Sequence, residues 1–167
     1  QLYKFTIAAD GKGDIGFAKA TFKISTTTVA VDNLKLYEDG VDITKTAITA
    51  TVAESTAAGV DIFEVLLKTE QLIGNEYVLV GAGSSKTYVL KGDVSGWGAA
   101  GDKITVEMLG DNNFGAVQKF TTVDGYADDN FIWSDLFLGF NTTTATGANE
   151  WANSYKLLST TTQSFTY

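Results

Sequence analysis

The stretch Lys103-Ile104-Thr105-Val106-Glu107-Met108 alternates strictly between polar and apolar side chains. Successive side chains of a β-strand point to opposite faces, so Ile104, Val106 and Met108 share one face. Alternation of this kind is typical of a strand with one face on a hydrophobic core and the other in water. The stretch therefore predicts an antiparallel, half-buried strand.

The same alternation occurs at the start of the chain, where Tyr3, Phe5 and Ile7 fall on one face. Two other stretches, residues 62–67 and 77–80, are apolar at almost every position. Continuous apolar runs of this length are typical of strands that are covered on both faces. We expect these two strands nearer the centre of the structure.

One stretch changes phase. Ile15 and Phe17 lie at odd positions, whereas Phe22 and Ile24 lie at even positions. A strand that keeps a single buried face needs one extra residue to make this change. The sequence therefore predicts a β-bulge near Ala18-Lys19.

Turn-forming residues separate these strands at intervals of roughly 8–15 residues, which suits a sandwich and not βαβ units. Gly with Asn or Asp carries the turns, because these residues tolerate positive φ. We predict an all-β, antiparallel, Ig-like β-sandwich of about ten strands, with at most one short helix within residues 148–158. We expect a single domain over residues 1–167, with residues 110–167 as a possible smaller lobe.

Composition excludes several functions. The chain has no Pro, Cys or His, its positive charges are all Lys, and its net charge is −8. Without Cys there is no disulfide framework and no thiolate metal site. Without Arg, and with an acidic surface, we expect no nucleic-acid binding. No apolar run approaches the roughly 20 residues that span a bilayer, so we expect no membrane insertion. The composition is typical of secreted β-proteins, so we expect an extracellular protein.

Several segments, which together cover most of the chain, resemble a recurring pattern in large surface proteins: residues 2–24, 33–37, 84–94, 101–111, 129–135 and 151–155. On these segments the chain is similar to Ig-like β-sandwich modules of cell-surface envelope proteins in uncultured, ultra-small bacteria. It departs from their pattern at Lys156-Leu157-Leu158, where Gly-Leu-Pro often stands. The resemblance implies a structural role at the cell surface, in a surface layer or filament, and no catalytic residues.

The sequence offers one candidate metal site. Asp124, Asp128 and Asp129 crowd one predicted loop, and Ca²⁺ prefers carboxylate and carbonyl oxygens from such loops. The alternative is that these are solvated turn carboxylates. No other cofactor is expected.

Trp97 lies between two glycines, in a loop where the indole is expected to be exposed. Exposed aromatic rings form platforms for sugars on many β-sandwiches, so Trp97 is a candidate glycan-binding residue. The alternative is a loop aromatic that folds back over the edge of the sandwich. Asn141 begins an Asn-Thr-Thr sequon and is a candidate glycosylation site.

An enzymatic function is not expected. Nucleophilic catalysis by Ser or Thr requires a nearby base, and the chain has no His, no Ser-x-x-Lys and no Gly-x-Ser-x-Gly motif. Pairs of carboxylates are inevitable in a chain with 20 acidic residues, so their presence indicates nothing.

Both ends of the chain have the pattern of strands. Exposed terminal strands offer unpaired N–H and C=O groups that a second copy can complete. We therefore predict a structural cell-surface subunit that assembles with itself, or, as the alternative function, a glycan-binding adhesin module. The alternative is that the two terminal strands are ordinary edge strands within one domain and do not mediate assembly. The predicted assembly residues are Leu2, Tyr3, Phe5, Ile7, Phe165 and Tyr167.

Overall fold

The computed structural model describes residues 1–44, 49–54, 59–67, 78–110, 130–134, 136 and 159–167, and for residues 49–54 the backbone alone. These residues form eleven β-strands and no helix. The strands are β1 (Tyr3–Ala8), β2 (Ile15–Thr27), β3 (Ala30–Glu38), β4 (Val41–Asp42), β5 (Thr49–Glu54), β6 (Val60–Leu66), β7 (Val78–Val80), β8 (Ser85–Ser95), β9 (Lys103–Met108), β10 (Phe131–Ser134) and β11 (Gln163–Thr166).

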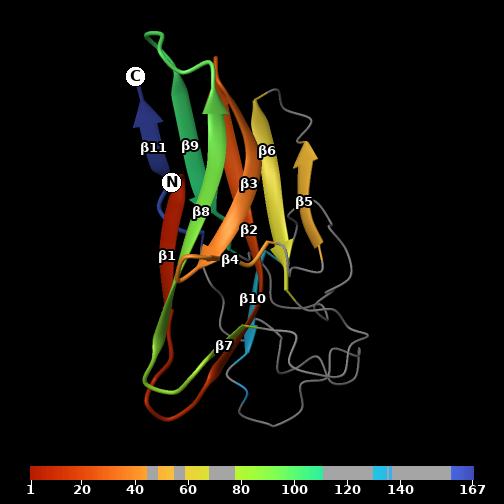
Figure 1. Cartoon of the computed structure of the whole chain (residues 1–167), viewed down its shortest axis with the longest axis vertical. Helices are drawn as coiled ribbons and strands as arrows, with labels where there is room; N and C mark the ends of the chain where they lie inside the picture. Colours follow the sequence, from red (N-terminus) through yellow and green to blue (C-terminus); the bar gives the residue numbers. More distant parts are fainter. Residues whose placement is uncertain (45–48, 55–58, 68–77, 111–129, 135, 137–158) are drawn as a thin grey trace.

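The strands form two sheets that lie face to face (Figure 1). The smaller sheet has the order β1-β8-β3-β4, and the larger, seven-stranded sheet has the order β11-β9-β2-β6-β5, with β7 and β10 also paired to β2. Every strand pair is antiparallel. The prediction of an antiparallel β-sandwich is therefore confirmed. The helix predicted within residues 148–158 lies outside the described residues.

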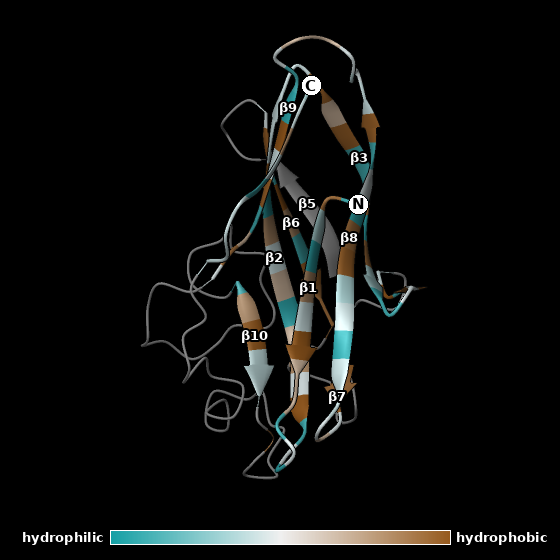
Figure 2. Ribbon diagram, turned by 90° about the vertical axis from the view of Figure 1, so that its left-hand side faces the viewer, coloured by the Kyte–Doolittle hydropathy of each residue, from teal (hydrophilic) through white to brown (hydrophobic). Residues whose placement is uncertain are grey.

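The core lies between the two sheets and is rich in aromatic rings. Phe5 of the smaller sheet stacks on Tyr88 at 4.9 Å between ring centroids and meets Phe17 of the larger sheet edge-on at 6.2 Å. Phe17 in turn stacks on Phe131 at 5.2 Å. Figure 2 shows apolar and polar residues alternating along β1 and β8. These rings join the strands of both sheets into one hydrophobic cluster.

Strand β2 is the centre of the larger sheet. It pairs with β6 and β7 along one edge and with β9 and β10 along the other. In the pairing with β10, Ile132 lies opposite Lys19 and Trp133 lies opposite Phe17, so that Ala18 is skipped. The predicted bulge near Ala18-Lys19 is confirmed. It lets Phe17 and Ala20 both face the core.

Both continuous apolar stretches form strands of the larger sheet, but only β6 is covered on both faces. Ile62 and Phe63, which point to opposite faces, are both 2% exposed, so this strand is covered on both sides. Strand β7 is a three-residue strand at the end of β2, and its Leu79 is 46% exposed. The expectation of a central position holds for β6 and is wrong for β7.

Candidate interaction groove between the terminal strands

The two terminal strands lie on the same side of the sandwich. Strand β1 is the edge of the smaller sheet and β11 is the edge of the larger sheet (Figure 1). The hydroxyl of Tyr3 donates a hydrogen bond to that of Thr160, just before β11, and so joins the two edges. One side of the molecule is therefore built from the first and the last segments of the chain.

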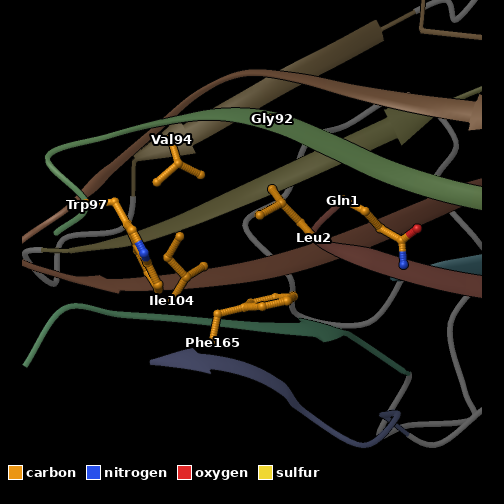
Figure 3. A pocket seen from close by; sticks show the side chains of 7 residues that line it. All are labelled: Gln1, Leu2, Gly92, Val94, Trp97, Ile104 and Phe165. Carbon is orange, nitrogen blue, oxygen red and sulfur yellow. The ribbon is translucent and has the colours of Figure 1, made fainter. Parts of the chain in front are cut away.

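A groove of about 260 Å³ opens on this side, near one end of the sandwich (Figure 3). Both sheets contribute to it: Gly92 and Val94 come from β8, Ile104 from β9 and Phe165 from β11. The polar side-chain groups among the lining residues are the amide of Gln1 and the indole N–H of Trp97. The full lining is Gln1, Leu2, Gly92, Val94, Trp97, Ile104 and Phe165.

Trp97 stands in the loop between β8 and β9, and Asp102 holds this loop in shape. The carboxylate Oδ2 of Asp102 accepts hydrogen bonds from the backbone N–H groups of Gly98 and Ala99, each at 2.7 Å. Its Oδ1 accepts a hydrogen bond from the Thr28 hydroxyl. All three hydrogen bonds favour the charged carboxylate and so hold the pKa of Asp102 below its ordinary value, and the bond from Thr28 makes the largest contribution.

The loop is also tied to β11. The backbone N–H of Tyr167 donates to the backbone C=O of Asp102 at 3.1 Å. The Trp97 ring meets the Tyr167 ring edge-on, with 6.3 Å between centroids. The last residue of the chain therefore packs on the loop that carries Trp97.

Gly92 shapes the floor of the groove. A Cβ atom at this position would lie 2.9 Å from Val31 Cγ1 and 3.1 Å from both Leu2 Cδ1 and Leu34 Cδ2. Such distances are closer than carbon atoms normally approach. The absence of a side chain at position 92 is what allows Leu2 to pack beneath the groove.

The lining indicates what the groove can bind. It is apolar, and the carboxylate nearest to Trp97 in the loop already accepts three hydrogen bonds. A sugar site needs polar groups for the hydroxyls beside the aromatic ring. The groove is thus chemically better suited to apolar side chains than to a sugar, although Trp97 itself is 39% exposed, as its position between glycines indicated.

The structure divides the six predicted assembly residues into two groups. Leu2 and Tyr3 are buried, at 3% and 4% exposure, and belong to the core. Phe5 and Ile7 are half-buried against it. Phe165 and Tyr167, at 36% and 66%, are exposed. Strand β1 can therefore offer a partner its backbone edge, whereas β11 offers both its edge and aromatic side chains.

The predicted calcium residues Asp124, Asp128 and Asp129 and the predicted glycosylation residue Asn141 lie outside the described residues. In the part of the chain that is described, no group of three or more acidic residues is placed to hold a metal ion. The carboxylates of the first turn bind backbone instead: Asp10 accepts from the N–H of Lys12 at 3.0 Å, and Asp14 accepts from that of Ala82 at 2.7 Å.

Sequence reasoning missed that the Trp97 loop and the chain end form one surface. Ile104 was expected only as a core residue, and no local pattern links Trp97 with Tyr167, which lies in a distant part of the chain. One signal was available in the sequence. Tyr88, Leu90 and Val94 lie at alternate positions on one face of β8, and Gly92, which has no side chain, interrupts that apolar face.

Comparison with models of known protein families found no match, and comparison with curated protein sequences found no significant match. Among the residues described, there is no helix long and apolar enough to cross a membrane.

Proposed function

We propose that this protein is a structural subunit of an extracellular surface layer or filament, and that it assembles through the edge strands of its larger sheet. The observation that carries the proposal is the edge at β11: among the described strands it pairs with β9 alone, and Phe165 and the adjoining Tyr167 are exposed there. Unpaired strand edges are templates for pairing with another chain, and isolated proteins usually protect them. Strand β11 has no charged side chain and no Pro to protect it.

In the part of the chain that the structure describes, the other edge of the same sheet is β5, whose one paired strand is β6. If β11 of one copy pairs with β5 of the next, the sheet continues from subunit to subunit. Such a contact joins two different surfaces, and heterologous contacts that do not close produce filaments. A contact of β11 with β11 would instead give a closed dimer.

Aromatic side chains are suited to anchor such a contact. Phe165 and Trp97 line the groove, and Tyr167 packs edge-on against Trp97. Aromatic residues dominate the energetics of protein interfaces. The net charge of −8 opposes association at low salt. Assembly should therefore increase when salt or Ca²⁺ screens the acidic surface.

The experiment is negative-stain electron microscopy and analytical ultracentrifugation of the purified chain, at low salt, at high salt and with millimolar calcium. We expect ordered filaments or sheets that are lost in the variant Phe165→Lys. The control is Leu79→Lys, since Leu79 is also exposed, at 46%, but belongs to β7 and not to the proposed contact strands β11 and β5. A chain that stays monomeric in all conditions would contradict the proposal.

The half-exposed Trp97 ring supports a second candidate function, a glycan-binding adhesin module. Binding to a glycan array by the monomer, lost in Trp97→Ala and kept in Phe165→Lys, would favour this function over assembly. Loss of filaments in Phe165→Lys without any glycan binding would favour assembly.

A further inference from the structure

The described residues contain six buried polar or charged side chains, and four of them belong to one region of the larger sheet. Lys19 and Thr21 come from β2, Glu64 from β6 and Asn130 from the residue before β10. Their exposed fractions are 3%, 0%, 1% and 3%. We call these four residues the buried polar cluster.

Strand register places the cluster on the face of the sheet that points away from the core. Phe63 and Val65 of β6 face the core, so Glu64 between them faces outward. Thr21 lies directly opposite Glu64, and Lys19 lies two residues further along β2. Lys19 and Glu64 are therefore diagonal neighbours, a separation that a long side chain can bridge.

Asn130 occupies the matching position on the other side of β2. Phe131 lies opposite Ala20 and Ile132 lies opposite Lys19, so residue 130 comes next to Thr21. Phe131 belongs to the core and Ile132 to the outward cluster with Ala18 and Leu66. By alternation Asn130 shares the outward face, diagonal to Lys19. Its Nδ2 donates to the C=O of Gly110 at 3.0 Å.

The contact at the centre of the cluster is a buried ion pair. Lys19 Nζ lies 3.1 Å from Glu64 Oε1, which is within the range for direct proton transfer. A buried ion pair gains little stability for the protein, because removing both charges from water costs about as much as their attraction returns. Transfer of the proton from the ammonium to the carboxylate removes both charges and leaves a nucleophilic amine.

We propose that Lys19 forms a covalent side-chain amide with Asn130, and that Glu64 is the proton shuttle for this reaction. Glu64 takes one proton from the Lys19 ammonium. The amine Nζ attacks Cγ of Asn130 and forms the new C–N bond. A second proton moves from Nζ, by way of Glu64, to Nδ2 as the old C–N bond breaks, and ammonia leaves. Glu64 ends in the neutral acid form, with the proton that Lys19 first gave up.

The reaction needs no oxidant, cofactor or second protein, since nucleophile, shuttle and acyl donor are all in the chain. Its product replaces two buried charges with neutral groups and joins two neighbouring strands that are distant in sequence. Such a cross-link goes beyond the proposed assembly function and is independent of it. It would strengthen a subunit that bears load at a cell surface.

The test is intact-mass spectrometry of the purified, denatured full chain, followed by peptide mapping. We expect a mass below the sequence mass by one ammonia molecule, a branched peptide that contains Lys19 and Asn130, and no tryptic cleavage after Lys19. The variants Lys19→Met, Glu64→Gln and Asn130→Ala should each lack the branched peptide. Cyclisation of an N-terminal glutamine also releases ammonia, but that loss would persist in Lys19→Met.

The chain offers a matched control in the ion pair of Lys86 and Glu38. Its Nζ–Oε1 distance is shorter, 2.6 Å, but its side chains are 29% and 17% exposed. Lys86→Met should keep the full ammonia loss at Lys19. A wild-type chain with the complete sequence mass overturns the proposal. Loss of water, with a branch between Lys19 and Glu64, overturns the assignment of Asn130 as the acyl donor.

Discussion

Strands β2 and β11 belong to the same sheet and share an alternating pattern, yet they have opposite surroundings. Strand β2 pairs with four other strands, and its Phe22 and Ile24 are fully buried. Strand β11 pairs with one of the described strands, β9, and Phe165 is 36% exposed. Alternation therefore fixes which side chains share a face, whereas position in the sheet decides whether that face supplies stability or remains open to a partner.

The strongest test of this comparison is the removal of one phenylalanine ring from each strand. Phe22→Ala leaves a cavity between the sheets and should cost about 3–5 kcal/mol of unfolding free energy. Phe165→Ala should cost less, about 1–2 kcal/mol, because the Phe165 side chain is 36% exposed and leaves no closed cavity. Urea unfolding of the monomer measures both values. Equal losses would show that the chain end is part of the core.

The second test compares the two Lys–Glu ion pairs. Glu64→Gln removes the carboxylate beside Lys19 and with it the proposed proton shuttle, so Lys19 keeps a buried charge without a partner, and the variant should cost about 3–5 kcal/mol. Glu38→Gln removes the partner of the partly exposed Lys86 and should cost about 1 kcal/mol or less. Thermal unfolding followed by circular dichroism can rank the two variants. A similar small loss in both would mean that water reaches the Lys19 pair.

The sequence predicted the fold class and the bulge in β2 because both depend on local alternation. The change of phase between Phe17 and Phe22 was sufficient to place the bulge near Ala18-Lys19. It could not show that Lys19 and Glu64 are buried. Charged residues at alternate positions ordinarily face water, and whether the outward face of a sheet is covered depends on distant parts of the chain.

The candidate groove was predictable only in its separate parts. Trp97 was identified from its glycine neighbours, and Phe165 and Tyr167 from the pattern of the last strand. That these residues share one surface follows from the pairing of β11 with β9, which brings Phe165 opposite Ile104. No feature of the local sequence encodes that pairing.

The third test compares two glycines that both have positive φ. At Gly59, next to the central strands, φ is +75° and a Cβ would lie 2.6 Å from the backbone oxygen of Thr26. Gly59→Ala should cost about 2 kcal/mol or more, because steric overlap adds to the backbone strain. At Gly40, in an open turn, φ is +89° and no atom lies within 4 Å of such a Cβ. Gly40→Ala should cost about 1 kcal/mol, and urea unfolding measures the difference.

The smallest expected effect is a loss of stability at acidic pH, and it depends on Asp102, whose carboxylate holds the Trp97 loop beside β11. The pKa of Asp102 is below its ordinary value of 3.8 in the folded chain, so the unfolded state binds a proton more readily. The stability from this carboxylate is therefore present above the ordinary pKa and is lost as the pH falls through the lower, folded value.

We expect the melting temperature of the wild type to fall more steeply in this acidic range than that of Asp102→Asn, which has no proton to gain. Because Tyr167 is bound to Asp102, the fluorescence of Trp97 should change at the same acidic pH. Parallel melting curves for the two proteins would show that the hydrogen bonds to Asp102 do not stabilise the edge.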